Sequence, residues 1–173
     1  STKFEVRSYR EGVVRIAKFE KGILVSDTTE KTNLYIGGII AVCVGKAAEI
    51  VFDNCTNIGN ITKTAESVAR DAYVGGVVGV ISGATDGSTN DTRKTVTFNN
   101  DTANRGSIST KGTVSSLIVG GIFGEFKYYV DATFSGPATN YGTISHAGTS
   151  TNTSTVGGVI GRIIQGVTVK AFI

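Results

Sequence analysis

The sequence predicts an all-β chain wound into a right-handed parallel β-helix, or β-solenoid, of about three and a half repeats. Three recurring features support this prediction. A glycine-pair phrase occurs four times, beginning at Gly37, Gly75, Gly120 and Gly157. A second phrase, Asn-x-Gly-x-Ile, alternates with it at residues 57–61, 104–108 and 140–144. A phenylalanine precedes each of these, at Phe52, Phe98 and Phe134, and Phe172 follows Gly157 by the same interval as Phe52 follows Gly37.

The repeat period favours a solenoid over an ordinary globular fold. The glycine pairs lie 38, 45 and 37 residues apart, and an insertion of about nine residues within 82–94 explains the longest interval. A β-sandwich or β-prism built from the same strands is the alternative architecture. We expect a single repetitive domain over residues 1–173, with repeats near 35–72, 73–117, 118–154 and 155–173.

Each repeat is expected to contain two strands and two turns. The glycine-pair segments, such as residues 35–44, are β-branched and almost continuously apolar, which predicts strands buried on more than one side. Residues 94–100 and 130–136 alternate polar with apolar side chains, which predicts strands with one inner face. Residues 64–72 have a helix-like composition but are expected to form a loop or a single turn. The Asn-x-Gly phrases predict turns, because Asn tolerates left-handed backbone and Gly has no Cβ.

Stacked coils place equivalent residues in ladders. We predict an aliphatic ladder of Ile39, Val77, Ile122 and Val159. A ladder of small residues follows, with Ala41, Gly79, Gly124 and Gly161. The turns predict an asparagine ladder of Asn57, Asn104 and Asn140. One further series becomes polar late in the array and predicts a position that leaves the core: Val42, Val80, Glu125 and Arg162.

The two cysteines occupy different repeat positions. Cys43 aligns with Ile81, Phe126 and Ile163, and Cys55 aligns with Thr102 and Ala138. We therefore predict two separate buried thiols rather than a disulfide. His146 is the single histidine and is expected to lie in a solvated loop. With one histidine and no Cys-x-x-Cys motif, the sequence predicts no metal site and no cofactor.

The charge pattern bears on possible partners. Lys and Arg number 17 against 14 Asp and Glu, and the resulting net charge of +3 is scattered. Nucleic-acid binding is not predicted, because it requires a concentrated basic surface. No apolar run approaches the roughly 18 residues of a membrane-spanning helix. The chain does not begin with Met, and we expect it to be part of a larger surface protein.

The glycine phrases of residues 75–80 and 120–125, alternating with Asn-x-Gly-x-Ile, resemble the GLUG-type repeats of bacterial surface proteins. They also resemble the Gly-Gly repeat arrays of secreted proteins from gut Bacteroidetes. The resemblance covers about residues 19–173. It implies a β-helical fold and an extracellular or cell-surface location, since such repeats usually sit in large adhesins or beside the catalytic domains of secreted proteases. It implies no catalytic residues.

Two places are candidates for ligand binding. The insertion carries oxygen-bearing side chains at Asp86, Asn90 and Asp91, and insertions in solenoids often build the binding face. The spacing of these residues is not that of an EF-hand. Tyrosines can stack on sugar rings, which makes candidates of Tyr128, Tyr129 and Tyr141. Residues 127–131 also suit a plain strand end.

We predict a non-enzymatic repeat region of a bacterial cell-surface or secreted protein, acting as an adhesion module or stalk. Its predicted partners are glycans or host matrix proteins, with end-to-end contacts to flanking repeats. The alternative is a secreted polysaccharide-active β-helix enzyme, or the carbohydrate-binding part of one. That alternative requires acidic groups gathered on one face, for which the sequence offers Asp53, Asp101 and Asp131. We predict no catalytic residue.

Overall fold

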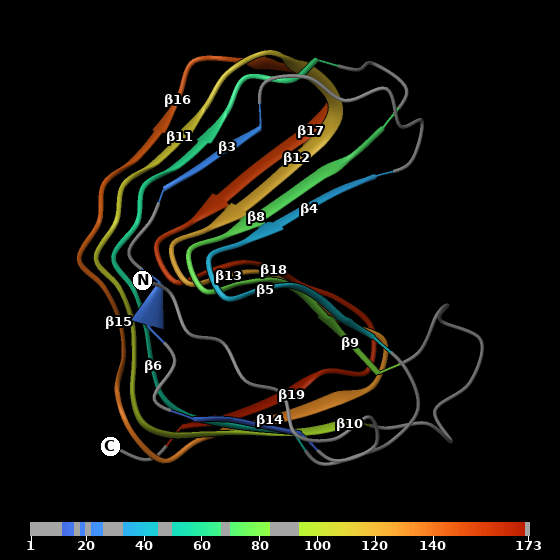
Figure 1. Cartoon of the computed structure of the whole chain (residues 1–173). Coiled ribbons are helices and arrows are strands. Elements are labelled where there is room, and N and C mark those ends of the chain that lie inside the picture. Colours follow the sequence, from blue (N-terminus) through green and yellow to red (C-terminus); the bar gives the residue numbers. More distant parts are fainter. Residues whose placement is uncertain are drawn as a thin grey trace.

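The computed structural model describes residues 12–15, 18–19, 22–25, 33–44, 50–66, 70–83 and 94–171. These residues form 19 strands in four sheets, and every pair of neighbouring strands is parallel. The strands stack into successive coils, as Figure 1 shows. The predicted parallel β-helix is confirmed, and the sandwich and prism alternatives are not.

The four sheets form the walls of the helix. Sheet A, along the bottom and lower left of Figure 1, contains β1 (Gly12–Arg15), β2 (Lys18–Phe19), β6 (Ile50–Asn57), β10 (Lys94–Asn104), β14 (Val130–Phe134), β15 (Ala138–Asn140) and β19 (Thr168–Ala171). Sheet B contains β3 (Ile23–Val25), β7 (Ile61–Lys63), β11 (Ile108–Thr110) and β16 (Ile144–His146). Sheet C contains β4 (Leu34–Gly37), β8 (Ala72–Gly75), β12 (Thr113–Gly120) and β17 (Thr149–Gly157). Sheet D contains β5 (Ile40–Val44), β9 (Val78–Ser82), β13 (Phe123–Lys127) and β18 (Ile160–Ile163).

One coil corresponds to one whole repeat. The register pairs Gly75 with Gly37 on one side and with Gly120 on the other, and Gly120 in turn with Gly157. A coil passes through sheets A, B, C and D in order, so its strands lie in four walls rather than the predicted two. The extra breaks occur at the two phrases, because the glycine pair separates β8 from β9 and the Asn-x-Gly turn separates β10 from β11.

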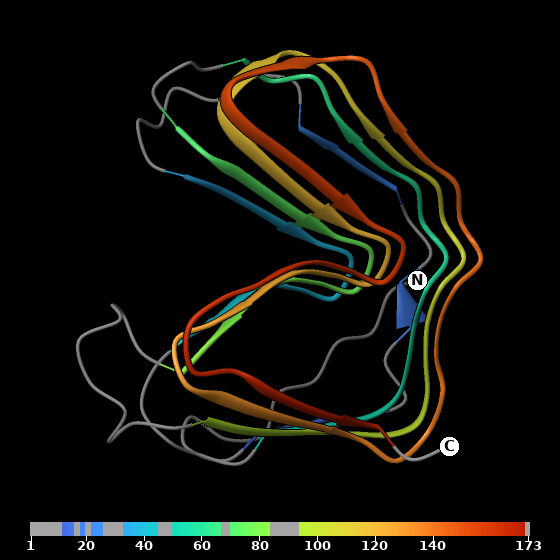
Figure 2. The ribbon, with the colours of Figure 1, turned by 180° about the vertical axis from the view of Figure 1, so that it is seen from behind.

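The glycine pairs form a sharp corner, and at Gly75 and Gly76 a larger residue does not fit. A Cβ at Gly75 would overlap the carbonyl oxygen of Val78, three residues later in the same corner. A Cβ at Gly76 would overlap the carbonyl of Gly121 in the next coil and the side chain of Asn104. The corner therefore points into the coil, as seen in Figures 1 and 2, and contacts the wall formed by the Asn-x-Gly turns between sheets A and B.

The asparagine ladder forms that opposite wall, as predicted. Nδ2 of Asn57 donates to Oδ1 of Asn104 at 2.8 Å, and Nδ2 of Asn104 donates to Oδ1 of Asn140 at 2.9 Å. The same amides bond the backbone of the glycine two residues later, as in Asn57 Nδ2 to Gly59 O at 2.9 Å. The two phrases recur together because they contact each other across the interior and satisfy buried polar groups there.

This contact divides the interior into two apolar cores. The core between sheets A and D contains the phenylalanine stack, with ring centroids 5.0 Å apart for Phe52 and Phe98 and 4.4 Å apart for Phe98 and Phe134. The core between sheets B and C is aliphatic. The aliphatic ladder is confirmed by backbone bonds from Ile39 to Val77 and from Val77 to Ile122. The small-residue ladder is confirmed too, because a Cβ at Gly79 would overlap the carbonyl of Ala41.

The ends of the array differ from the prediction in one respect. Phe172 was expected to align with Phe134, but the register pairs Phe134 with Ala171 instead, one residue earlier. Phe172 itself lies outside the described residues. Of residues 64–72, the structure describes 64–66 and 70–72, and no helix occurs in them. No helix in the described part of the chain has the length and apolarity needed to cross a membrane.

Candidate functional site

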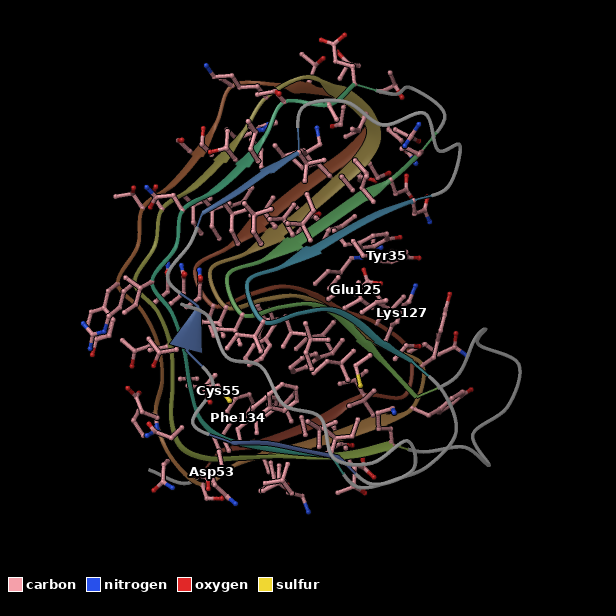
Figure 3. The ribbon with its side chains drawn as sticks, viewed as in Figure 1. Tyr35, Asp53, Cys55, Glu125, Lys127 and Phe134 are labelled. Atoms are coloured by element: carbon pink, nitrogen blue, oxygen red, sulfur yellow. The ribbon has the colours of Figure 1, made fainter. Side chains whose placement is uncertain are left out.

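Sheets C and D meet at a re-entrant corner on the outside of the coil, behind the glycine pairs. Two ladders of outward-facing side chains converge there. Sheet C contributes Tyr35, Tyr73, Ile118 and Thr155, and sheet D contributes Val42, Val80, Glu125 and Arg162. Figure 3 shows Tyr35, Glu125 and Lys127 gathered at this place. We call the group Tyr35, Tyr73, Glu125, Lys127 and Arg162 the outer corner.

The aromatic half of the outer corner is a tyrosine stack. The rings of Tyr35 and Tyr73 are nearly parallel, with centroids 5.3 Å apart, and Tyr73 is only 5% exposed. The hydroxyl of Tyr73 donates to Oδ2 of Asp71 at 3.4 Å. Burial raises the pKa of Tyr73 well above its ordinary value, and the negative charges of Glu125 and Asp71 raise it further. Tyr73 is therefore a neutral hydrogen-bond donor at physiological pH.

The charged half is an ion pair between adjacent coils. Glu125 is 1% exposed, and the Nε of Arg162 donates to its Oε2. Nζ of Lys127 lies 3.9 Å from Oε1, the other carboxylate oxygen, which accepts no hydrogen bond from the described residues. Burial opposes the charged form of Arg162, but the hydrogen bond and charge of Glu125 raise its pKa overall.

The prediction that this ladder leaves the core is wrong at Glu125. The carboxylate is fully buried because sheet C folds back over it and Arg162 stacks beside it in the next coil. A general acid or base must reach a substrate atom within hydrogen-bond distance. A carboxylate with no exposed surface and a guanidinium already bonded to it lacks that reach. The outer corner is therefore organised to join two coils and two sheets.

The candidates Tyr128 and Tyr129 form the turn between β13 and β14, so residues 127–131 do form a strand end. Both have positive φ, 56° and 65°. Tyr129 accepts a hydrogen bond from Gln165 Nε2 at 3.0 Å, and Lys127 Nζ lies 5.2 Å from the ring centroid of Tyr128. Positive φ is unusual for bulky residues and marks a backbone held by its neighbours.

The same turn holds both ends of the insertion. The N–H of Gly83 donates to the carbonyl of Lys127 at 3.1 Å, and the N–H of Lys94 donates to the carbonyl of Tyr129 at 2.9 Å. The segment between Gly83 and Lys94 carries the other predicted ligand-binding side chains. Those three residues, Asp86, Asn90 and Asp91, lie outside the described part of the structure.

Tyr141 lies in the Asn-x-Gly turn on the opposite wall, so the structure does not bring it to Tyr128 and Tyr129. Its side chain is 58% exposed. The guanidinium carbon of Arg105, from the preceding coil, lies 4.2 Å from its ring centroid. Ile58 occupies the same position two coils before Tyr141 and is 38% exposed. This outward ladder thus presents an aromatic ring paired with a cation.

The acidic residues proposed for the enzyme alternative do not form one column. Asp53 pairs with Asn99, whereas Asp131 pairs with Thr95. Asp53 instead accepts a hydrogen bond from Asn100 Nδ2 at 2.6 Å on the outer face of sheet A, the lower edge of Figure 3. Asp53 and Asp131 therefore stand at different positions along the strands of sheet A.

His146 and the cysteines occupy structural positions. His146 was predicted in a loop, but it is the last residue of β16, with Nδ1 2.9 Å from Thr110 Oγ1. Neither Cys43 nor Cys55 forms a disulfide, and Cys55 is buried whereas Cys43 is partly buried. Burial raises the pKa of Cys43, and Lys94 offsets part of that rise. The described residues contain no group of three or more His, Cys, Asp or Glu placed to hold a metal ion.

The outer corner was missed by sequence reasoning, although two signals pointed to it. Tyr35 and Tyr73 stand at the same repeat position, and Glu125 and Arg162 are opposite charges at another. Stacking makes equal positions neighbours, so each pair is a predictable contact. No protein-family model, curated protein or solved structure matches this chain. The resemblance to GLUG-type repeats therefore stays a prediction.

Proposed function

We propose that the chain is a non-enzymatic β-helical repeat region of a bacterial cell-surface or secreted protein, acting as an adhesion module or stalk. The observation that carries this proposal is that its repeated polar side chains bond to their equivalents in the next coil. Besides the asparagine ladder, Thr113 and Thr149 hydroxyls lie 2.8 Å apart, and Ser116 and Thr153 hydroxyls lie 3.1 Å apart.

Bonds along the axis stiffen the array without forming a reaction centre. Each coil gains its packing surfaces from the coils above and below, as in other one-dimensional repeat proteins. The buried carboxylate of Glu125 also joins two coils, because it pairs with Arg162 in the next coil. Such a structure suits a protein that holds a distance or presents a surface, and this supports the stalk part of the proposal.

The adhesion part rests on the ladder of Arg105 and Tyr141. The tyrosine is strongly exposed, and a guanidinium beside its ring can bond the hydroxyl or carboxylate groups of a sugar. Both side chains come from turns held rigidly by the asparagine ladder. A rigid aromatic next to a cation loses little conformational entropy on binding, and this favours a glycan ligand at that wall.

A binding panel of glycans and matrix proteins tests the proposal. We expect saturable binding that falls at least about tenfold in Tyr141→Ala. The matched control is Ile58→Ala, which shortens an exposed residue at the same position two coils earlier and should leave binding unchanged. Binding that survives Tyr141→Ala would contradict the glycan contact. Silence across the panel would leave the stalk function, and release of reducing sugar ends from any polysaccharide would favour the enzyme alternative.

A further inference from the structure

We propose that the face of the last coil, formed by β16, β17, β18 and β19, is a docking surface for one more coil of the same glycine-pair repeat. This inference takes from the proposed function only the idea of a repeat array, and it does not depend on glycan binding. The surface lies at the red end of the stack in Figures 1 and 2.

Gly158 is a glycine whose position does not require one within these coils. It is the second glycine of its pair, and its three equivalents are all blocked by the coil that follows them. A Cβ at Gly38 would lie 2.6 Å from Cγ of Asn57 and overlap the carbonyl of Gly76, and Gly76 and Gly121 meet the same two obstacles in their own next coils. A Cβ at Gly158 would meet no described atom within 4 Å.

Backbone conformation does not explain Gly158 either. Among the described residues, the glycines with positive φ are Gly112 and Gly166, so Gly158 adopts a backbone that other residues also adopt. Glycine in a strand-like segment is unfavourable unless another backbone approaches closely. The residue type at 158 therefore suits a contact with a carbonyl and an asparagine side chain that this set of coils does not supply.

The last coil also has backbone N–H groups without a backbone acceptor among the described residues. In each earlier coil, two or three successive N–H groups at the corner donate to the following coil. Gly121 donates to Gly157 O at 3.1 Å, and Ile122 and Phe123 donate to Val159 O at 3.0 and 2.9 Å. The equivalent N–H groups belong to Gly158, Val159 and Ile160. They have no backbone acceptor among the described residues.

Core positions are exposed in the last coil as well. Four residues equivalent to core residues are open on this face, namely Val156 at 50%, Val159 at 37%, Ile163 at 48% and Val169 at 39% exposed. Their equivalents in the preceding coil, including Val119, Ile122 and Phe126, are fully buried. Solvent-exposed apolar residues at core positions are a surface that another coil would cover.

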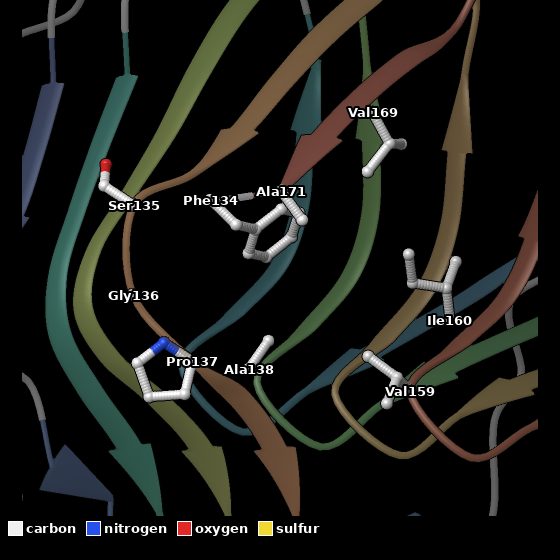
Figure 4. Close-up of a pocket in the computed structure, with 9 residues that line it drawn as sticks. All are labelled: Phe134, Ser135, Gly136, Pro137, Ala138, Val159, Ile160, Val169 and Ala171. Atoms are coloured by element: carbon white, nitrogen blue, oxygen red, sulfur yellow. The ribbon is translucent and has the colours of Figure 1, made fainter. Parts of the chain in front are cut away.

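A cavity of about 620 Å³ opens within this face, shown in Figure 4. Phe134, Val159, Ile160, Val169 and Ala171 line it, together with the turn at Pro137. It lies where the phenylalanine stack of sheet A would continue, because Ala171 stands in the position that Phe134 fills one coil earlier. The apolar side chains of a docked coil would cover this space.

The docked coil is thus defined by chemistry that the earlier coils show. It brings a Gly-Gly carbonyl to Gly158, an apolar residue over Val159 and an asparagine beside the corner. These are the contacts that the last coil itself makes with Gly121 and Ile122. The ladders and their register identify the occupant as a coil of this repeat type.

The test adds such a coil to the full chain. Because Phe134 pairs with Ala171, a copy of residues 135–171 inserted directly after Ala171 continues the register. We expect the extended chain to unfold in one transition at a higher temperature than the original. Gly158→Ala should shift the melting temperature of the original chain by less than about 1 °C, but lower that of the extended chain by about 5 °C or more.

Gly121→Ala is the matched control, since Gly121 is already blocked by the next coil and should destabilise both chains. Three results would overturn the proposal. The added coil could remain unfolded, with a protease removing it and leaving the original chain. Gly158→Ala could have the same effect in both chains. Finally, the original chain could dimerise in sedimentation experiments and lose the dimer in Gly158→Leu, which would make a second copy the occupant.

Discussion

Replacing Arg162 by methionine removes the guanidinium that bonds the buried carboxylate of Glu125 while keeping most of the side-chain volume. Breaking a fully buried ion pair costs about 3–5 kcal/mol, because the remaining charge is left without compensation. The Arg162 side chain is 31% exposed, and Lys127 stays 3.9 Å from the other oxygen. Both features reduce the cost, so we expect a loss of about 2–3 kcal/mol in the free energy of unfolding.

For a chain of this length, that loss corresponds to a fall of about 5–10 °C in melting temperature. Urea and thermal unfolding, followed by circular dichroism, measure it. Lys127→Met is the matched control, since its ammonium group is farther from the carboxylate and should cost less than about 1 kcal/mol. The same ladder holds Val42 and Val80, so the double variant Glu125→Val, Arg162→Val should return to within about 1 kcal/mol of the original chain.

Two outcomes would refute this reasoning. Arg162→Met could cost less than about 0.5 kcal/mol, which would mean that the pair behaves like a surface salt bridge. Alternatively, the double variant could be less stable than Arg162→Met alone. The stability of the corner would then come from side-chain packing rather than from the neutralised charge.

Three further predictions follow from buried polar groups. Asn104→Ala removes hydrogen bonds to Asn57 and Asn140 and leaves buried partners unpaired, so urea unfolding should show a loss of about 2–4 kcal/mol, and a loss below about 1 kcal/mol would contradict the ladder. In the folded chain, alkylation of Cys43 should be slower than that of a free cysteine at pH 8 because its pKa is raised, and a rate equal to the free thiol would count against this burial. Tyr73 has a raised pKa when folded, so the folded state holds its proton more tightly; its contribution to stability is complete below the ordinary tyrosine pKa of about 10 and is lost as the pH rises towards the folded value. Ultraviolet titration of Tyr73→Phe against the original chain should show one tyrosine fewer titrating late, and no difference would contradict the assignment.

Equivalent repeat positions were predictable from the sequence, and they determined most of the fold. Once the phrases were aligned, parallel stacking followed, and with it the asparagine ladder, the aliphatic ladder and the separate positions of Cys43 and Cys55. The physical reason is that a solenoid converts sequence period directly into contact between neighbours. Phe172 was misplaced because it was aligned by the 15-residue interval from Gly37 to Phe52, whereas the adjacent coil has a 14-residue interval from Gly120 to Phe134, which places Ala171 there.

The cross-section of the coil was decided only by the tertiary structure. A sequence shows that the glycine pairs and the asparagines recur, but not that they touch across the interior and divide it into two cores. That contact turns sheets C and D outward against each other and buries Glu125, a residue whose charge alone predicts exposure. The sequence period determines which residues stack along the axis. The angle at the glycine corner determines which sheets contact each other, and that angle is set only when the whole coil folds.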